Sequence, residues 1–505
     1  MFWREVSPKL SELHTLLPTS QLLGEDAEFI DLTLDSREVR KGWMFCATKG
    51  SKYDGHNFIE EAARNGAAAL MVSQQVDWPL PQLIVPSVRH ALGKVSDYTH
   101  GHPSQKLNLI GVTGTNGKTT TSYLIESILK ASGHSTGLIG TIEAKYKDSR
   151  HPSIHTTPEA PDLHRYLREM VDEGIDSVVM EVSSHGIDQH RVDSAHFSVA
   201  VFTNLTAEHL DYHGTIEQYY WAKSQLFLHS RSDIAIICID DPWGERLAQQ
   251  IEIPKITFGY NPIADVRITE VKVTPEGTNL KLEGRGYDTT LHVQIVGACN
   301  AQNAAAAFIA GRVLGASEEE ARLGIESCTG VSGRFQQVKL GQDFLVVVDY
   351  AHTPDSIKAL IQTVRDIIGP SGKVTLVAGA RGRRDRIKRP ELGRAAATAD
   401  LAILTTDNPG DEDPSNIVEQ LVAGTFDISK KHIQIELDRA LAIKRAIDGS
   451  EKGDAVLIVG RGHESFFRVG SNQISLDDRK EAEKAILAKL NHSASKRVVA
   501  TAEGL

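Results

Sequence analysis

The hydrophobic pattern of the chain consists of short apolar runs that alternate with amphipathic segments. From residue 107 onward, runs of four to six mostly apolar residues recur, and each has the length of one buried strand. After the first run, Leu124, Ile125, Ile128 and Leu129 fall on one helical face before Gly133. Strands that alternate with helices predict a parallel sheet covered on both faces. The expected strands are Leu107–Val112, Ser177–Val182, Val199–Asn204 and Ile234–Ile239.

A second series of strands and helices follows the Gly-rich turn at Gly330–Gly333. Ahead of both series, the first hundred residues hold shorter strand-like runs and end in the polar stretch Thr99–Lys106, which is typical of a linker. The further elements expected are strands at Phe29–Leu34, Trp43–Thr48, Phe344–Val348, Val374–Ala378, Leu401–Thr405 and Val456–Val459, and helices at Glu60–Ala69, Asp355–Ile368 and Arg439–Ile447.

These elements predict an α/β protein of three domains, in keeping with 505 residues at roughly 150 residues per domain. A small N-terminal α/β domain spans residues 1–103. A central domain, with a P-loop-type parallel sheet and helices on both faces, spans residues 104–332. A Rossmann-like α/β domain spans residues 333–493, and residues 494–505 have the composition of a flexible tail.

Composition and charge argue against several classes of protein. The chain has 55 Lys and Arg against 66 Asp and Glu, a formal net charge of −11, which disfavours binding of nucleic acid or an anionic membrane through bulk charge. No apolar run approaches the ~20 residues of a membrane span, and no signal peptide is expected. Four cysteines stand far apart without a C-x-x-C pair, as in reduced cytoplasmic proteins. We expect a cytoplasmic monomer with no nucleic-acid partner and no membrane span.

The most informative segment is the Gly-rich loop Gly111–Thr121, between an expected strand and an expected helix. Its glycines let backbone N–H groups turn toward a polyphosphate, and the helix N-terminus adds positive potential. A lysine and a threonine open the helix, where they neutralise the β- and γ-phosphates and ligate Mg²⁺. The common P-loop pattern would have a glycine where Val112 stands, so the loop is a variant. The residues expected to bind ATP are Gly114, Thr115, Asn116, Gly117, Lys118, Thr119 and Thr120.

Carboxylate, hydroxyl and imidazole groups follow the next two expected strands, in Met180–Gly186 and Asn204–Gly214. Ligands of α/β sheets bind at the carboxyl ends of the strands, so Glu181 and His209 are expected to converge on the phosphate loop. A carboxylate suits Mg²⁺, a hard ion that prefers oxygen ligands. The sequence therefore predicts ATP as co-substrate and Mg²⁺ as cofactor.

These segments, together with the pair Ala222-Lys223, resemble the Mur ligases of bacterial cell-wall synthesis. The resemblance runs from Asp35–Arg37 to Gly462–Glu464 and is strongest to members that add the third residue to UDP-N-acetylmuramoyl-L-alanyl-D-glutamate. It implies an ATP-dependent amide ligase that forms an acyl phosphate, which an amino acid then attacks. It also implies that the N-terminal domain binds the UDP-sugar, the central domain ATP and the C-terminal domain the amino acid.

The resemblance further implies the roles of individual residues. Lys118, Lys223, His209 and Arg334 would be catalytic, and Lys223 would carry a carbamate that joins Thr119, Glu181 and His209 around the metal. The further ATP contacts that it implies are Asn300, Asn303, Arg334 and Asp349. The implied contacts to the UDP-muramoyl dipeptide are Leu34, Ser36, Ser51, Lys52, Tyr53, His155, Thr156, Thr157, Ser183, Gln189 and Arg191.

For the added amino acid, the resemblance supports two possibilities. Members that use meso-diaminopimelate typically have an arginine where Gly410 stands, and lysine users lack it, whereas Gly460–Glu464 resembles the diaminopimelate type. Arg383 or Arg386 would supply the missing guanidinium, since arginine pairs bidentately with carboxylates. We therefore expect diaminopimelate, with L-lysine or another diamino acid as the alternative. The implied amino-acid-binding residues are Arg384, Asp407, Asn408, Pro409, Gly410, Gly460 and Glu464.

Two other functions remain as alternatives. Folylpolyglutamate synthetase is similar in its P-loop and its lysine carbamate, but it would lack the roughly hundred-residue domain before the loop. A non-catalytic nucleotide-binding regulator would leave Glu181, Lys223 and Arg334 without a role.

Overall fold

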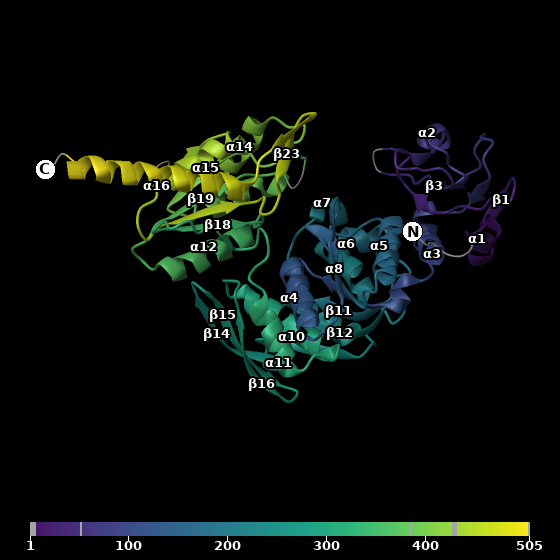
Figure 1. The fold of residues 1–505 in the computed structure, drawn as a ribbon, viewed down its shortest axis with the longest axis horizontal. Coiled ribbons are helices and arrows are strands. Elements are labelled where there is room, and N and C mark those ends of the chain that lie inside the picture. Colours follow the sequence, from purple (N-terminus) through teal and green to yellow (C-terminus); the bar gives the residue numbers. More distant parts are fainter. Residues whose placement is uncertain (1–6, 51–52, 384–385, 427–431, 503–505) are drawn as a thin grey trace. The chain divides into compact units, whose positions relative to one another are not determined.

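The computed structural model describes residues 7–50, 53–383, 386–426 and 432–502, with side chains up to residue 492 (Figure 1). It contains three larger sheets, one in each predicted domain, and a small two-stranded one. The chain divides into two compact units, and the division passes through three strands and one helix between residues 266 and 313. The first unit comprises residues 1–269, 282–289 and 302–325, and the second comprises residues 270–281, 290–301 and 326–505.

The N-terminal sheet has five short strands in the order β1-β5-β4-β3-β2. Neighbours from β2 to β5 are parallel, and β1 pairs with β5 in antiparallel fashion. Side chains of α1 and α3 cover one face, and those of α2 cover the other. The bounds are α1 Leu10–Leu16, β1 Gln21–Leu23, β2 Leu32–Thr33, β3 Met44–Cys46, α2 Ile59–Arg64, β4 Ala69–Val72, β5 Gln82–Ile84 and α3 Val88–Thr99.

The expected elements of this domain are shorter in the structure. Strands β2 and β3 occupy only part of the strands expected at Phe29–Leu34 and Trp43–Thr48, and α2 only part of the helix expected at Glu60–Ala69. The helix ends at Arg64, because Ala69 already begins β4, whose four residues are all buried. An alanine-rich stretch favours a helix locally, but here burial in the sheet decides the conformation.

The central sheet has eleven strands in the order β16-β15-β14-β13-β12-β11-β6-β10-β7-β8-β9. Strand β6 lies between β10 and β11 and is parallel to both, so the carboxyl ends of these three strands meet at one edge. The expected strands are confirmed, whereas the hairpins at both ends of the sheet were not predicted. The strands are β6 Asn108–Thr113, β7 Thr136–Ile139, β8 Glu143–Tyr146, β9 Ser149–Pro152, β10 Ser177–Glu181, β11 Phe197–Phe202, β12 Ser232–Cys238, β13 Lys255–Gly259, β14 Val266–Thr274, β15 Gly277–Gly284 and β16 Tyr287–Val293.

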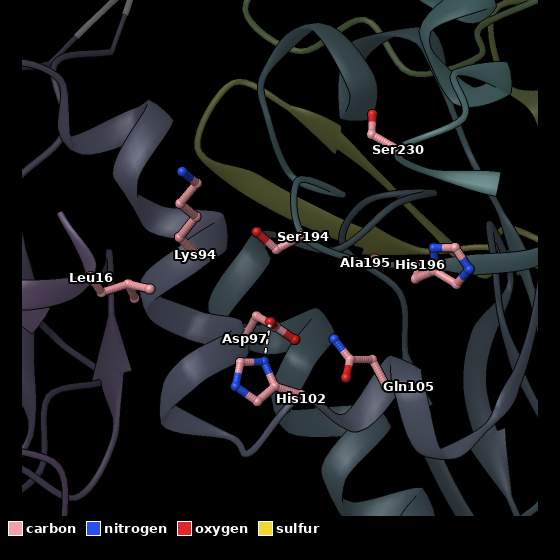
Figure 2. Close-up of a pocket in the computed structure, with 9 residues that line it drawn as sticks. All are labelled: Leu16, Lys94, Asp97, His102, Gln105, Ser194, Ala195, His196 and Ser230. Carbon is pink, nitrogen blue, oxygen red and sulfur yellow. Dashed lines mark hydrogen bonds and ion pairs between the residues drawn. The ribbon is translucent and has the colours of Figure 1, made fainter. Parts of the chain in front are cut away.

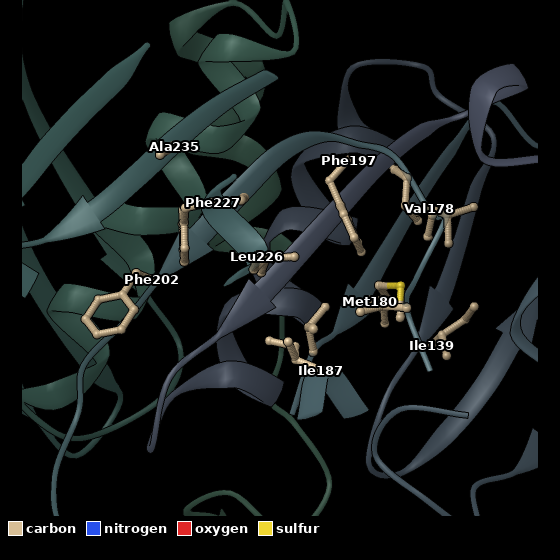
Figure 3. Close-up of a cluster of buried hydrophobic side chains, with 14 of the residues drawn as sticks. Ile139, Val178, Met180, Ile187, Phe197, Phe202, Leu226, Phe227 and Ala235 are labelled. Atoms are coloured by element: carbon tan, nitrogen blue, oxygen red, sulfur yellow. The ribbon is translucent and has the colours of Figure 1, made fainter. Parts of the chain in front are cut away.

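Helices cover both faces of this sheet. On one face, α5 and the segment around α8 join alternate strand residues in a buried cluster that includes Val178, Met180, Phe197 and Phe202 (Figure 3). Helix α4 contacts β6, β7 and β10, and its buried residues lie outside that cluster, so α4 covers the opposite face. The helices are α4 Lys118–Ala131, α5 Ala160–Asp172, α6 Ser184–Asp188, α7 Leu210–His213, α8 Ile216–Ser224, α9 Pro242–Gln250, α10 Cys299–Val313 and α11 Glu318–Ser327.

The C-terminal sheet has six strands in the order β17-β18-β22-β19-β20-β21, parallel except for β17. Helices α12, α13 and α14 cover one face, and α15 and α16 cover the other. Because β22 returns between β18 and β19, the sheet is doubly wound, as the Rossmann-like prediction requires. The strands are β17 Gln336–Gln337, β18 Leu345–Asp349, β19 Val374–Ala378, β20 Leu401–Leu404, β21 Ile433–Ile435 and β22 Ala455–Val459, with a separate hairpin of β23 Phe466–Val469 and β24 Asn472–Ser475.

The helices of this domain include one at the C-terminal end that differs from the prediction. Helix α16 continues to Ala502, through most of the segment expected as a tail. The helices are α12 Pro354–Ile368, α13 Arg389–Ala396, α14 Pro414–Ala423, α15 Arg439–Asp448 and α16 Asp478–Ala502.

A buried ion pair joins α15 to α16. Asp478, fully buried at the start of α16, accepts hydrogen bonds from Nε (2.8 Å) and Nη2 (2.7 Å) of Arg439, which is also buried. Nη2 of Arg439 also donates to the carbonyl of Val459 at the end of β22. One guanidinium therefore ties two helices to the central strand of the sheet.

Replacing Asp478 with alanine leaves a buried, unpaired guanidinium, which should lower the free energy of unfolding of this domain by about 3–5 kcal/mol. Urea unfolding followed by circular dichroism measures it. Lys480→Ala on the same helix is the control and should change stability by less than about 0.5 kcal/mol. Asp478→Ala behaving like the control would contradict the assigned role of this pair.

Candidate active site

The phosphate loop joins β6 to α4 through backbone conformations that only glycine adopts readily. Gly114 and Gly117 have φ values of +150° and +87°. A Cβ atom at Gly114 would lie 1.9 Å from Oγ1 of Thr203, and one at Gly117 would lie 2.3 Å from Oδ1 of Asn303. The loop is therefore closely packed between the end of β11 and helix α10, with no room for side chains at these two positions.

The end of β11 holds the loop through hydrogen bonds. The Asn204 carbonyl accepts from the Thr115 amide (2.8 Å), and its side-chain oxygen accepts from the Asn116 amide (2.9 Å). Thr203 donates its hydroxyl to the Asn116 carbonyl at 2.6 Å. These bonds fix the loop before any ligand arrives, which is what preorganised phosphate binding needs.

Two lysines converge on one carbonyl oxygen of the loop. Nζ of Lys118 donates to the carbonyls of Gly114 (2.9 Å) and Thr115 (2.8 Å), and Nζ of Lys223 donates to the same Gly114 oxygen at 2.8 Å. Lys223 is only 1% exposed, and its ammonium lies 4.6 Å from the Tyr219 ring centroid. Burial, and then the charge of Lys118, lower the pKa of Lys223 well below its usual value.

The carboxylate predicted to bind the metal, Glu181, lies at the end of β10 and is 1% exposed. Its oxygens accept from the hydroxyl of Thr119 (2.9 Å) and from the hydroxyl (3.0 Å) and amide (2.8 Å) of Thr141. Within the described residues no cation pairs with it. The structure thus brings the two expected oxygen ligands, Thr119 and Glu181, together, and adds Thr141, which the sequence did not signal.

His209 precedes α7 in a left-handed conformation, with φ of +56°. Burial, together with the charges of His185, Lys118 and Lys223, lowers its pKa to about 4, although Glu208 opposes the shift. At neutral pH the imidazole is therefore uncharged and has a lone pair for a metal. Across the described parts of the chain, no three or more His, Cys, Asp and Glu side chains form a ready metal cluster, so the predicted site depends on Thr119 and on modification of Lys223.

The residues expected to contact the dipeptide form a network beside Glu181. The hydroxyl of Thr157 donates to the Glu181 carbonyl (3.0 Å) and accepts from the Ser183 amide (2.9 Å). Arg191 donates to the Thr157 carbonyl (2.9 Å) and to the Gln189 side-chain oxygen (2.7 Å). Four of the expected residues are thus in one place. Thr156 shares a hydrogen bond of 3.1 Å with Thr141, and His155 is exposed.

The residues expected at the UDP-sugar lie in the N-terminal domain. Leu34 is half-buried, Ser36 is buried and bonded to the Glu61 carboxylate, and Tyr53 is 72% exposed. Ser51 and Lys52 lie outside the described residues. The described residues of this set lie in one small domain, but no network of hydrogen bonds joins them to one another.

Of the further residues expected at ATP, Asn303 borders the loop and accepts from Thr121 at 3.3 Å. The others belong to the second unit. Asn300 donates to the Val296 carbonyl at 3.0 Å. Asp349 accepts from the amides of Phe335 (2.6 Å) and Ala351 (2.7 Å), and burial raises its pKa despite nearby Arg334. The Arg334 guanidinium lies 4.6 Å from the ring centroid of Tyr350.

The expected amino-acid-binding residues also lie together in the second unit. Asp407 is buried and borders Gly460, where a Cβ atom would lie 2.7 Å from Oδ2 of Asp407. The Asn408 carbonyl accepts from the Gly382 amide at 2.9 Å, and Pro409 and Gly410 follow. Glu464 forms an ion pair with Arg381, a residue that the sequence analysis did not single out. Arg384 lies outside the described residues.

A separate pocket of about 580 Å³ lies in the first unit. Figure 2 shows the residues that line it. None of the predicted site residues lines it, and a hydrogen bond of 2.6 Å joins Asp97 and His102 in its wall. Its lining residues are Leu16, Lys94, Asp97, His102, Gln105, Ser194, Ala195, His196 and Ser230. The predicted active site is therefore not this cavity.

Comparisons with known proteins identify the family of this chain. Three family models match: the Mur ligase family catalytic domain at residues 30–98, the Mur ligase middle domain at 112–311 and the Mur ligase glutamate ligase domain at 333–462. A UDP-N-acetylmuramoyl-L-alanyl-D-glutamate–2,6-diaminopimelate ligase of Bacillus licheniformis is 40% identical over 95% of this chain and 99% of its own. This chain belongs to the Mur ligase family. A ligase of the same name from Aquifex aeolicus is 41% identical, over 89% of this chain and 93% of its own.

Solved structures support the three-domain Mur ligase fold. A structure of a UDP-N-acetylmuramoyl-L-alanyl-D-glutamate–2,6-diaminopimelate ligase is 29% identical, with a TM-score of 0.67, and covers 96% of this chain and 99% of its own. A folylpolyglutamate synthase of Mycobacterium tuberculosis has a TM-score of 0.60 at 17% identity and covers 73% of this chain and 92% of its own. The family resemblance and the fold class are confirmed, and this Mur ligase is an ATP-dependent ligase.

The close packing of the phosphate loop can be tested at Gly117. Gly117→Ala adds a Cβ atom against Asn303 at a positive φ, so we expect ATP affinity to fall at least about tenfold. Calorimetric titration with ATP measures this. Gly133→Ala is a matched control, because Gly133 also has a positive φ (+85°) but its Cβ would meet nothing within 4 Å in the described structure. The control should lose some thermal stability and keep its ATP affinity, and equal affinities in the two variants would contradict the packing argument.

Proposed function

We propose that this Mur ligase joins meso-diaminopimelate to UDP-N-acetylmuramoyl-L-alanyl-D-glutamate in the cytoplasm, with ATP as the energy source, as a step of peptidoglycan synthesis. The observation that carries the proposal is the likeness of 40% over 95% of the chain to a ligase of that name. The site supports it, because the residues expected to bind phosphate, metal and peptide lie near the ends of β6, β10 and β11. We expect the enzyme to act as a monomer.

In the first step, the free carboxylate of the dipeptide attacks the γ-phosphorus of ATP, which gives an acyl phosphate and releases ADP. We propose that Lys118 leaves its carbonyl partners and binds the phosphates when ATP is present. The negative charge of a phosphate attracts an ammonium more strongly than a carbonyl dipole does. The network of Thr157, Ser183 and Arg191 is bonded to the backbone of Glu181, so a dipeptide bound there would lie beside the phosphate loop. We propose that Arg334 adds positive charge at the γ-phosphate.

The residues present fit Mg²⁺. Oγ1 of Thr119 and Oε2 of Glu181 lie 2.9 Å apart, close to the spacing of adjacent oxygen ligands around an ion with bonds of ~2.1 Å. Glu181 is a buried carboxylate without a cation partner in the described structure, which is costly unless a cation binds. His209 and a modified Lys223 would complete the set. When bound, Mg²⁺ would supply charge neutralisation on the transferred phosphate.

The environment of Lys223 favours the proposed carbamate. Its lowered pKa makes the neutral amine available, and the neutral amine is the form that adds carbon dioxide. Addition of carbon dioxide to the neutral amine releases one proton and leaves a carbamate anion, which the charge of Lys118 attracts. Its oxygens are also ligands that Mg²⁺ accepts.

In the second step, an amine of the diamino acid attacks the acyl carbon and phosphate leaves, which forms the amide. We propose that Asp407, Asn408, Pro409, Gly410, Gly460, Glu464 and Arg384 bind this amino acid. L-lysine remains the second candidate, because Gly410 lacks the guanidinium expected of a diaminopimelate user. Folylpolyglutamate synthesis is disfavoured, because the synthase that aligns covers only 73% of this chain.

A panel of acceptors tests the proposal. The enzyme, ATP, Mg²⁺ and UDP-muramoyl dipeptide are combined with meso-diaminopimelate, L-lysine or L-ornithine, and phosphate release and the UDP-tripeptide are measured. A parallel reaction contains a folate and glutamate in place of the dipeptide. We expect the highest kcat/KM with diaminopimelate. A preference for lysine would overturn the choice of amino acid. Turnover only in the reaction with folate and glutamate would overturn the function.

The role of Lys118 gives a second prediction. Lys118→Ala removes a cation from the transferred phosphate and should lower kcat by about 100- to 1,000-fold while the fold stays intact. Lys130→Ala on the same helix is the control, because Lys130 is exposed and pairs with Glu126. Near wild-type turnover of Lys118→Ala would show that the phosphate-loop assignment is wrong.

Lys223→Ala gives a third prediction. It should lose most activity and regain part of it when acetate or formate is added, because a small carboxylate can occupy the space of the carbamate. Lys118→Ala should show no such rescue, since its loss is that of a cation. The carbamate would be ruled out by an unmodified Lys223 in mass spectra of active native enzyme, together with full activity of Lys223→Ala.

A further inference from the structure

In the second unit, the segment expected to bind the amino acid has a glycine at position 410, where a diaminopimelate user would have an arginine. Gly410 has a φ of +59°, which disfavours other residues, and its amide donates to the carbonyl of Arg468 at 3.0 Å. The backbone of this segment is therefore used for pairing with the β23 hairpin. A second carboxylate on the amino acid must be bound by another residue, because burying it unpaired would be unfavourable.

The two arginines that were expected to supply the missing guanidinium already form ion pairs within the protein. Arg383 pairs with Asp411 at 2.5 Å, and Arg386 pairs with Glu412 at 2.9 Å. Both arginine side chains are more than half exposed, at 58% and 63%. Each arginine side chain thus lies at the surface and is already paired with a carboxylate, so neither is suited to bind a buried substrate carboxylate.

Arg381 is differently placed. The residue after it, Gly382, donates its amide to the Asn408 carbonyl at 2.9 Å, and a Cβ atom there would lie 1.8 Å from the Pro409 carbonyl oxygen. The backbone of Arg381 is therefore fixed directly beside the expected amino-acid-binding segment. Buried Arg389 strengthens this position by donating to the Arg381 carbonyl at 2.9 Å.

The guanidinium of Arg381 has remaining capacity for a ligand. Nη2 bonds Glu464 and donates to the Tyr350 hydroxyl at 3.3 Å. Nε is buried and has no hydrogen-bond partner in the described structure, while the side chain as a whole is 22% exposed. The ring centroid of Tyr350 lies 5.6 Å from Cζ of Arg381 and 4.6 Å from Cζ of Arg334. The same aromatic side chain therefore borders Arg381 and the arginine proposed at the γ-phosphate.

We propose that Arg381 binds the distal carboxylate of the diamino acid while Glu464 binds its distal ammonium, so that Arg381 takes the role of the arginine missing at position 410. The inference rests on the proposed function. A cation and an anion side by side match a zwitterionic amino-acid end, which diaminopimelate has and lysine lacks. Lysine would bring an unaccompanied ammonium next to Arg381, and the guanidinium would repel it.

Exchanging Arg381 tests this inference through the choice of acceptor. kcat/KM is measured for meso-diaminopimelate and for L-lysine with wild type, Arg381→Gln and Arg381→Lys. In Arg381→Gln, the ratio of kcat/KM for diaminopimelate to kcat/KM for lysine should fall at least about tenfold, as expected for losing a charged hydrogen bond. KM for ATP and for the UDP-dipeptide should stay within about twofold. Arg381→Lys keeps the positive charge but loses the paired N–H donors of the guanidinium, so its ratio should lie between those of wild type and Arg381→Gln.

Arg383→Gln is the matched control, because it removes a neighbouring guanidinium that is already paired with Asp411, and it should leave the ratio unchanged. An equal loss with both acceptors in Arg381→Gln and Arg381→Lys would mean that Arg381 only supports Glu464, which overturns the inference. A wild-type preference for lysine also overturns it and leaves the ligase function standing. Failure of wild type to join either diamino acid would instead refute the proposed function itself.

Discussion

Two amines, one half-buried and one buried, share one backbone oxygen of the phosphate loop. Lys118 and Lys223 both donate to the carbonyl of Gly114, within 2.9 Å and 2.8 Å. Two like charges so close together repel each other, and carbonyl dipoles compensate them less well than a negative charge would. The arrangement is tolerable when one amine is neutral, and it becomes favourable when a polyanion binds. Burial, and then the charge of Lys118, lower the pKa of Lys223, and the same pair of amines prepares the loop for phosphate.

The close packing of the loop follows from this arrangement. Two amines can reach one oxygen only if the loop is fixed, and the hydrogen bonds from Thr203 and Asn204 at the end of β11 fix it. The glycines remove the side chains that would keep the loop away from β11 and α10. Because β6 lies between β10 and β11, Glu181 and the dipeptide network reach the same edge of the sheet.

In the C-terminal unit, the arrangement of charges distinguishes structural from available arginines. Arg439 is fully buried against Asp478, and Arg389 is bonded to Glu412, so both act as structural ties. Arg383 and Arg386 are held at the surface by acidic neighbours. Arg381 differs because its partner, Glu464, belongs to the expected acceptor site. The neighbouring arginines Arg381, Arg383 and Arg386 therefore have separate environments and do not form one uniform patch.

The sequence by itself determined the alternation of strands and helices, the variant P-loop and the family, because apolar periodicity and the Gly-Lys-Thr turn are local properties of the chain. It also indicated Glu181 and His209, since strand ends can be read from the same pattern. Only the tertiary structure decided that Thr141 joins Thr119 at Glu181, that Arg383 and Arg386 are already paired, and that Arg381 contacts Glu464. These contacts join residues from different strands and loops. Which charges meet there depends on sheet order and backbone geometry, and neither leaves a signal in the spacing of residues along the chain.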